Sequence, residues 1–472
     1  MTHQLLRKFH KPLIFILTAH LAITFLLLSS CNSDDNGIED DSTLDIRDTD
    51  SVSIDSLITE TEDSTSLSSD SLLTQFGHSL PVVKITINGE YLWSEDSGLF
   101  VVGNGTVENY LQNWEFPAYL SYYEFGEKAF IDTVGFRIKG KKSRHLPNKS
   151  IGLYWRTKYG KDVLKHPMFK NNSIEKFERL KLHNGGSHSR RLIIRTAGIT
   201  RTIQGHTLLD FASTQPVIVY LNEEYWGLYV LTEMITPHYF KYKYDLEKSD
   251  INLLVSSPKH PVIDDGTADS WNDEVIPFLT ENDLADSINY SEALQMIDKQ
   301  LLIDYFIIET YIFNRDWPIF NMRWWNSKSQ TSIYSKWRYL IFDLDTSFGS
   351  ANSEELWLGD FFINTDLMDQ ELGDGFFVFN AFMKNIEFRI EFFSRYLYFI
   401  DTVFTEENVG LAFDNLTNEI GVDEYNRHQQ KWDYETGETW LEGIESFKKF
   451  NKDRNLWIKP LILEWLSEAK TE

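Results

Sequence analysis

The chain contains one cysteine, Cys31, among its 472 residues. A single cysteine excludes a disulfide within the chain, so the folded part must draw its stability from a large core. Hydrophobic residues make up 42% of the sequence and aromatic residues 15%, which is ample for such a core. Positive charge is also scarce, and the formal net charge of -26 argues against nonspecific binding of nucleic acid.

Several common signatures of enzymes are missing from the sequence. It has no Walker loop, no Rossmann fingerprint, no nucleophile elbow and no internal repeat. His183 and His188 are too few, and too far from other ligand types, to indicate a zinc site. The chemistry must therefore come from less common combinations of residues.

A long apolar run occurs at the N-terminus. A basic stretch at residues 7–11 precedes an apolar segment at 13–28, an order typical of an export signal. The segment ends in Leu28-Ser29-Ser30-Cys31, which resembles the lipobox of lipoprotein precursors. We expect residues 1–30 to be a signal peptide and Cys31 to carry a lipid anchor. The alternative is an uncleaved membrane helix.

Residues 31–76 are rich in Asp, Ser, Thr and Glu and have no aromatic residue before Phe76. This composition predicts a disordered tether, extended by the repulsion of like charges. The acidic residues after Cys31 resemble sorting signals of some lipoproteins. We therefore expect an exported protein, anchored in the outer membrane or at the cell surface rather than facing the periplasm.

From Ser79 the pattern predicts strands and then helices. Asn88-Gly89 is a hairpin signal, and a helix is expected to begin near Ser187 or Ser189 and to stop at Gly198. Strands are expected at 80–87, 98–104, 130–131, 134–140 and 149–155, with a hairpin of 217–222 and 225–231 around Glu223-Glu224. Beyond Thr236 the pattern is helical, with apolar helices at 301–313 and 376–404. The predicted fold is α+β, with a sheet-rich lobe at 79–235 and a helical lobe at 236–472.

Asp316 and Asn321 stand five residues apart in the loop that follows the apolar helix 301–313. Kinase catalytic loops have this spacing, in which the Asp accepts the proton of the substrate hydroxyl and the Asn holds a metal ion. The same spacing also arises by chance or in a helix cap, so it is informative only together with other motifs.

Asp343 and Asp345 follow the strand-like segment 337–342. Two carboxylates at the end of a strand suit a hard divalent cation with phosphate partners. The alternative is a turn whose carboxylates only cap backbone N–H groups.

The segment from Gly140 to Ser150 is a basic loop between two predicted strands. Such a loop can fold over triphosphate oxygens, with a lysine acting as a point charge. The alternative is that its lysines and arginines serve solubility alone.

The order of these pieces resembles the spore coat protein H (CotH) family, which has an atypical protein-kinase fold. The resemblance extends over about residues 79–460. The matching segments are Leu80-Pro81-Val82, Asn113–Pro117, Ser143-Arg144, Pro147–Ser150, Ser189-Arg190, Leu221–Glu233, His428–Trp432 and Arg454.

The resemblance implies roles for individual residues. Lys149 would pair with nucleotide phosphate, with Ser143 and Arg144 in the loop above it, and Glu233 would lie at the hinge between the lobes, near the adenine. Asp316 would be the catalytic base. Asn321 and Asp343 would hold the metal, with Asp345 as a possible second carboxylate; Asp343 is preferred over Asp345 as the main ligand.

One departure concerns the predicted helix 189–198, which carries no Glu to pair with Lys149. The ion pair usual in kinases is therefore not assigned. Three arginines in this segment either face phosphate or balance an acidic surface; they are Arg190, Arg191 and Arg195.

The expected function is an extracytoplasmic phosphotransferase that uses ATP with Mg²⁺ or Mn²⁺ and acts on protein hydroxyls. The expected partners are nucleotide, a protein substrate and, through the anchor, a membrane, but no nucleic acid. The alternative is an inactive surface protein for binding or assembly that retains the kinase-like fold. A third reading is another transfer from the nucleotide, such as nucleotidylation, because the same carboxylates would serve it.

Overall fold

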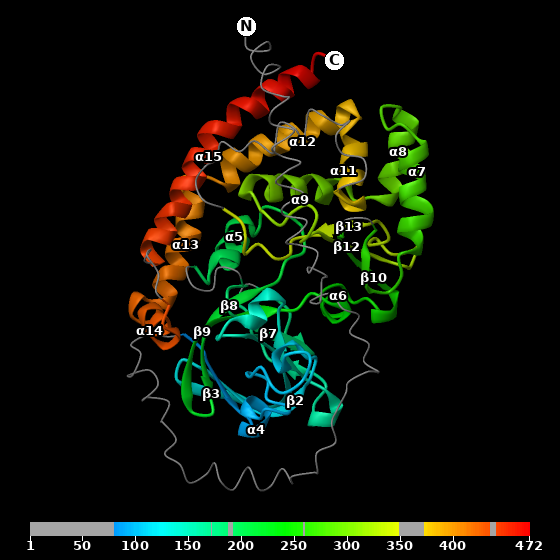
Figure 1. Cartoon of the computed structure of the whole chain (residues 1–472). Helices are drawn as coiled ribbons and strands as arrows, with labels where there is room; N and C mark the ends of the chain where they lie inside the picture. The colour runs from blue at the N-terminus through cyan, green and yellow to red at the C-terminus, as the bar shows by residue number, and fades with distance from the viewer. Residues whose placement is uncertain (1–79, 171, 187–191, 258–259, 349–371, 435–439) are drawn as a thin grey trace. The chain divides into compact units, whose positions relative to one another are not determined.

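The structure, a computed structural model, describes residues 80–170, 172–186, 192–257, 260–348, 372–434 and 440–472 (Figure 1). The predicted signal peptide, the tether and Cys31 lie outside the described residues. Within the part of the chain that is described, no helix has the length and apolar character needed to cross a bilayer.

Seven strands of the N-terminal half form a closed barrel in the order β1-β2-β3-β4-β7-β9-β8. The barrel closes where β1 pairs in parallel with β8, with Val82 opposite Ile218. The other neighbouring strands are antiparallel. The strands are β1 (Val82–Thr86), β2 (Phe116–Glu124), β3 (Glu127–Lys139), β4 (Ser150–Tyr154), β7 (Arg179–His183), β8 (Thr214–Leu221) and β9 (Glu224–Glu233).

Strand β8 is apolar from Pro216 to Leu221 because both of its faces are buried there. Val217 and Val219 belong to the core inside the barrel, whereas Ile218 and Tyr220 pack into the core of the helical region. Successive side chains of a strand point to opposite faces, so a strand between two cores needs an unbroken apolar run.

The predicted hairpin around Glu223 is confirmed. Asn222 and Glu223 form its turn with positive φ angles of 48° and 68°. The Asn222 side chain also bonds both backbone groups of Ile87, accepting from its nitrogen at 2.8 Å and donating to its oxygen at 2.9 Å. The same asparagine therefore makes the turn and fastens it to the chain beyond β1.

Two predictions for the segment after β1 are wrong. Asn88 does not make a hairpin turn: its side chain accepts a hydrogen bond from Glu90 nitrogen and caps the short helix α4 (Gly89–Trp93). Residues 98–104 do not form a strand, and Leu99 nitrogen instead donates to Tyr91 oxygen at 2.9 Å. Asparagine competes for nearby backbone N–H groups, and here capping prevails over turn formation.

The prediction of a helix from Ser187 or Ser189 to Gly198 is also wrong. The helix is α5 (Arg195–Ile203), and Gly198 lies inside it rather than at its end; residues 187–191 lie outside the described residues. A Cβ atom on Gly198 would come within 2.3 Å of the Phe413 ring on α13 (Glu406–Ile420). Gly198 is thus explained by close helix packing, and Figure 1 shows α5 and α13 side by side.

The rest of the chain is mainly helical, as predicted. Helix α9 (Lys299–Ile312) confirms the apolar helix at 301–313. The apolar segment 376–404 is divided, because the Asn385 side chain caps a new helix by accepting from Glu387 and Phe388 nitrogens. The other helices are α6 (Pro237–Tyr244), α7 (Ile276–Glu281), α8 (Ser287–Met296), α11 (Asp374–Met383), α12 (Ile386–Tyr398), α14 (Val422–Trp432) and α15 (Trp440–Ala469).

The sequence prediction missed a four-stranded sheet within this helical half. Its strands run in the order β11 (Val262–Asp265), β10 (Ile251–Val255), β12 (Arg323–Ser327) and β13 (Arg338–Leu340). Of these, only the strand-like character of 337–342 was predicted. The strands are short and separated by helices, so each is too brief to show the alternation of polar and apolar residues that identifies a strand in a sequence. The observed class is therefore α+β in both halves of the described chain.

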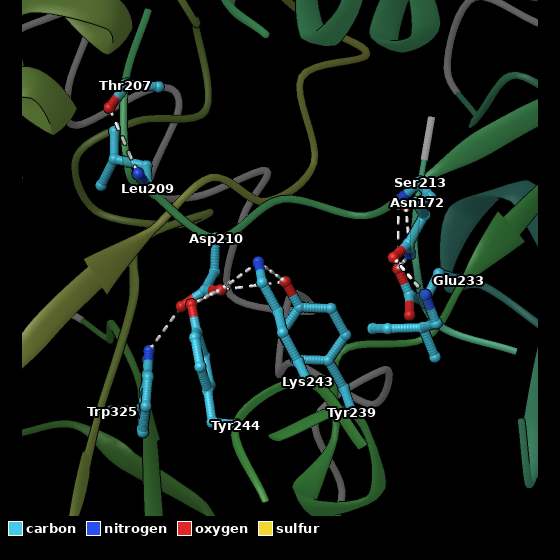
Figure 2. A network of polar contacts seen from close by, with 11 residues as sticks. Asn172, Thr207, Leu209, Asp210, Ser213, Glu233, Tyr239, Lys243, Tyr244 and Trp325 are labelled. Carbon is cyan, nitrogen blue, oxygen red and sulfur yellow. Dashed lines mark hydrogen bonds and ion pairs between the residues drawn. The ribbon is translucent and has the colours of Figure 1, made fainter. Parts of the chain in front are cut away.

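The buried carboxylate of Asp210 joins this sheet to α6 (Figure 2). Its oxygens accept hydrogen bonds from the Tyr239 and Tyr244 hydroxyls at 2.9 and 2.7 Å and from Trp325 Nε1 at 3.0 Å. Lys243 Nζ lies 2.7 Å from the same carboxylate. Since four donors surround it, this buried charge is compensated.

Replacing Gly198 with alanine should destabilise the protein by about 1–3 kcal/mol, since the added methyl group overpacks the contact with the buried Phe413 ring. Denaturant unfolding of the purified protein measures the change. Gly410→Ala on α13 is the matched control, because nothing lies within 4 Å of its Cβ position. That control should be neutral or slightly stabilising. Equal stability of the two variants would contradict the packing role of Gly198.

Candidate functional site

The two candidate loops meet at one end of the small sheet. The loop with Asp316 and Asn321 leads into β12, and the loop with Asp343 leaves β13. These strands are antiparallel, and Arg323 at the start of β12 pairs with Leu340 at the end of β13. The sheet therefore brings together the predicted metal ligands Asn321 and Asp343.

The backbone oxygen of Asp343 joins the loops directly. It accepts hydrogen bonds from Asn321 Nδ2 at 3.1 Å and from Asn314 Nδ2 at 3.3 Å. Because Nδ2 of Asn321 is used in this way, its Oδ1 is the atom left to act as a ligand. Sequence reasoning had given Asn314 no role, although it directly precedes Arg315 and Asp316 in the motif.

Left-handed backbone is concentrated in and beside these loops. Four of the nine described non-glycine residues with positive φ are Phe313, Asn321, Asp343 and Phe348, with φ angles of 50–62°. Such conformations are uncommon for residues with a Cβ atom and persist where surrounding contacts impose them. Here the contacts include the bonds to Asp343 oxygen and a bond from Phe348 nitrogen to Ile312 oxygen at 2.7 Å.

Asp316 has an exposed side chain within a charged neighbourhood. Partial removal from water raises the pKa of its carboxyl group, and the negative charge of Asp345 raises it further. The positive charges of Lys142, Arg315 and Lys141 act in the opposite direction. The basic loop and both aspartates are therefore close enough to influence one another, as a phosphotransfer site would require.

Asp345 is 7% exposed and packs against a glycine turn that sequence reasoning missed. A Cβ atom on Gly186, which has a φ of 59°, would come within 2.0 Å of an Asp345 carboxylate oxygen. Gly186 nitrogen donates to Asn184 Oδ1 at 3.0 Å, and Ser150 Oγ donates to the same oxygen at 2.8 Å. Asn184-Gly185-Gly186 after β7 is a turn signal that could have been noticed. This turn connects Asp345 to the start of β4, next to Lys149.

Lys149 is 4% exposed, and burial lowers its pKa to about 8. Its ammonium group donates to the backbone oxygens of Arg144 and, at 3.0 Å, of Leu146. It also lies 4.2 Å from the centre of the Tyr110 ring. Among the described residues no carboxylate pairs with Lys149, and α5 contains no acidic residue. The ion pair usual in kinases therefore stays unassigned among the described residues.

Arg144 and Ser143 shape the basic loop. Arg144 is buried and donates to Gly140 oxygen and, at 2.9 Å, to Leu111 oxygen. Ser143 Oγ lies 2.1 Å from the position that a Cβ atom on Gly140 would occupy, and Gly140 has a φ of 100°. The guanidinium group of Arg144 is thus engaged with backbone oxygens that hold the loop together.

Arg195, at the start of α5, is buried rather than part of an open phosphate-binding surface. Its guanidinium group donates to the backbone oxygen of Ser347, just beyond Asp345. It also lies 4.8 Å from the centre of the Phe447 ring. Arg190 and Arg191 lie outside the described residues.

Glu233 lies at the end of β9, where the chain leaves the barrel for α6 (Figure 2). Its carboxyl group accepts from Asn172 Nδ2 at 3.2 Å and from Ser213 nitrogen at 3.4 Å. Burial raises its pKa to about 7. The residue thus occupies the junction at which sequence reasoning expected a hinge.

The predicted metal ligands are two carboxylates and one amide. No group of three or more His, Cys, Asp or Glu residues suited to a metal ion occurs among the described residues. The chemistry of the predicted set nevertheless fits a hard cation, since every ligand atom is an oxygen. The repulsion between the negative charges of Asp316 and Asp345 also fits a cation site, because a bound cation would reduce that repulsion.

The C-terminal motif residues support the scaffold. His428 is buried, and its Nδ1 accepts from Leu228 nitrogen at 3.0 Å. A Cβ atom on Gly227, which has a φ of 129°, would approach His428 Nδ1 to 2.7 Å and Trp432 Nε1 to 2.9 Å. Arg454 donates to Thr310 and Tyr311 oxygens at 2.6 and 3.2 Å, at the end of α9 that precedes the candidate loop with Asp316.

Glu309, near the end of α9, is buried, and burial raises its pKa to about 8. In the unfolded chain the group ionises near its ordinary value of 4.5, whereas in the folded protein it keeps its proton to about pH 8. Its contribution to stability is therefore full below about pH 4.5 and is lost as the pH rises toward about 8.

Glu309→Gln removes this titration, so the stability of the variant relative to the unmodified protein should rise between pH 5 and pH 8. Unfolding free energies of both proteins, measured across that range, test this expectation. A difference that does not change with pH would show that Glu309 is ionised in the folded protein.

Comparison with known proteins agrees with the pattern of motifs. The model of a family described as CotH kinase protein matches residues 136–458, which include both candidate loops and the basic loop. A search of curated proteins found no significant match. The family match spans well over half of the chain, and this chain therefore belongs to the CotH kinase protein family.

Proposed function

We propose that this protein is a phosphotransferase that moves the terminal phosphoryl group of ATP to a hydroxyl group of a protein. Membership of the CotH kinase protein family supports a kinase-like role. The observation that carries the proposal is the junction at Asp343, whose backbone oxygen is bonded by Asn321 from the catalytic loop. The junction joins the loop that carries the candidate base Asp316 to the loop that carries the candidate ligands Asp343 and Asp345.

In the proposed reaction, Asp316 accepts the proton of the acceptor hydroxyl. The hydroxyl oxygen forms a bond to the terminal phosphorus, the bond from that phosphorus to the bridging oxygen breaks, and ADP leaves. The raised pKa of Asp316 favours its holding the transferred proton. Catalysis would rest mainly on positioning and on charge stabilisation.

A divalent cation, Mg²⁺ or Mn²⁺, would be held by Asn321 and Asp343, with Asp345 as the second carboxylate. When bound, such an ion neutralises phosphate charge. The chain's own residues then have separable tasks. Asn321 and Asp343 would hold the ion, and the basic loop with Ser143, Arg144 and Lys149 would cover the phosphates.

A two-lobed, kinase-like arrangement is part of the proposal. The barrel would form the sheet-rich lobe and the helices with the small sheet the other, with Glu233 at the hinge near the adenine. The buried position of Glu233 at the exit from the barrel supports this assignment.

The proposed location is outside the cytoplasm, with the protein held to a membrane through lipid on Cys31. The support is the signal-like N-terminus, the lipobox-like segment and the acidic stretch after it. The proposed partners are nucleotide, a protein substrate and the membrane, with no nucleic acid.

One observation favours a second candidate, a binding or assembly protein that retains the fold without turnover. An ammonium group has three N–H donors. The ammonium group of Lys149 already donates to two backbone oxygens and lies over the Tyr110 ring. Phosphate binding by Lys149 therefore requires a change in the basic loop, which an assembly protein would not need.

Mg²⁺ and ATP together should raise the melting temperature of the full-length protein in detergent by roughly 3 °C or more at saturation. Asp343→Ala should abolish the shift, because it removes a proposed metal ligand. Asp316→Asn should keep the shift and lower phosphoryl transfer at least about 100-fold, because it removes only the base.

Asp414→Ala is the control, since this exposed aspartate pairs with Lys448 at 2.7 Å and belongs to neither loop. It should behave as the unmodified protein. Absence of any metal-dependent shift in the unmodified protein would favour the second candidate.

The lipid anchor has its own test. Cells fed a clickable fatty acid should label this protein, and Cys31→Ala should remove the label entirely, because the chain has no other cysteine. Label that persists in Cys31→Ala would overturn the lipoprotein assignment. An unlabelled protein of precursor size would support an uncleaved membrane helix.

A further inference from the structure

Two buried side chains of α9 reach the catalytic loop at separate points. Tyr305 and Glu309 stand four residues apart, a spacing that places them on the same face of the helix. The Tyr305 hydroxyl donates to Asn321 oxygen at 3.4 Å, and Glu309 Oε2 accepts from Asn314 Nδ2 at 3.0 Å. The helix therefore holds the loop near both of its ends.

The Asn314 side chain is fixed from both ends of its amide. Its Nδ2 donates to Glu309 Oε2 and to Asp343 oxygen, and its Oδ1 accepts from the Thr346 hydroxyl at 2.7 Å. Rotation of the amide would break all three contacts. A shift of the Glu309 side chain would therefore move the Asn314 amide, and with it the loop that carries Asp343.

Glu309 is suited to this task as a neutral acid. The side chain is fully buried, and its second oxygen, Oε1, has no hydrogen-bond partner among the described residues. An ionised carboxylate in that position would leave charge uncompensated in the protein interior. A neutral carboxyl group supplies the same acceptor to Asn314 without that penalty.

We propose that Glu309 is a positioning residue which, through Asn314, sets the Asp343 peptide and so the cation-binding geometry of the site. This inference rests on the proposed function, because it assigns Glu309 a role only if Asp343 binds a cation. Glu309 does not touch the nucleotide or the acceptor. Residues outside the immediate ligands commonly change metal affinity by about 10–100-fold when they are removed.

The test is a Mn²⁺ titration of the full-length protein at fixed ATP, with melting temperature as the readout. Asn314→Ala should weaken the apparent Mn²⁺ affinity by about tenfold or more, because the Asp343 peptide loses the side-chain donor that Asn314 supplies. Glu309→Leu should do the same, since it removes the acceptor that orients Asn314. Glu309→Gln retains an acceptor oxygen and should stay within about twofold of the unmodified protein.

Glu424→Leu is the matched control. Glu424 is also a buried carboxyl group, and it contacts Tyr225 on β9 and Arg427 on its own helix α14. It should alter stability and leave Mn²⁺ affinity unchanged. If Glu309→Leu fails to fold, Asn314→Ala still tests the contact through which Glu309 would act.

The outcomes separate this inference from the proposed function. Unchanged Mn²⁺ affinity in Asn314→Ala, together with loss of affinity in Asp343→Ala, would overturn the role of Glu309 and leave the proposed function intact. Unchanged affinity in Asp343→Ala would overturn the proposed function itself.

Discussion

The hairpin of β8 and β9 is buried on both faces, and the rest of the structure is arranged around this constraint. One face completes the barrel core and the other packs against the helices. Contacts from the far end of the chain fix the hairpin, since His428 accepts from Leu228 nitrogen and packs on Gly227. Because β9 ends at Glu233, the hairpin also determines where the chain enters the helical half.

The site depends on a second, smaller element. Antiparallel pairing of β12 and β13 brings Asn321 and Asp343 to one end of the small sheet, and helix α9 supplies the contacts that hold the loops there. Arg454 on α15 caps the last turn of α9. Three stretches that lie apart in the sequence therefore hold the candidate site in place: α9, the region of β12 and β13, and α15.

Patterns of local origin were predictable. Residues close together in the sequence were enough to predict the hairpin at Glu223 and the helix α9. They were also enough to single out Asp316 and Asn321 by their spacing. Features that depend on distant partners were not. Gly198 is explained by a ring on α13, and Asn314 gains its role only from Asp343 and Glu309. The Gly186 turn was missed for the same reason, because its contact with Asp345 crosses between distant segments.

Closure of the barrel by β1 and β8 has a consequence for behaviour at high local concentration. An open sheet presents unpaired backbone groups at its edges, to which a strand of another molecule can add. A closed barrel offers no such edge. Copies of this protein crowded together on a surface would therefore lack, in the barrel, the usual route to aggregation by strand exchange.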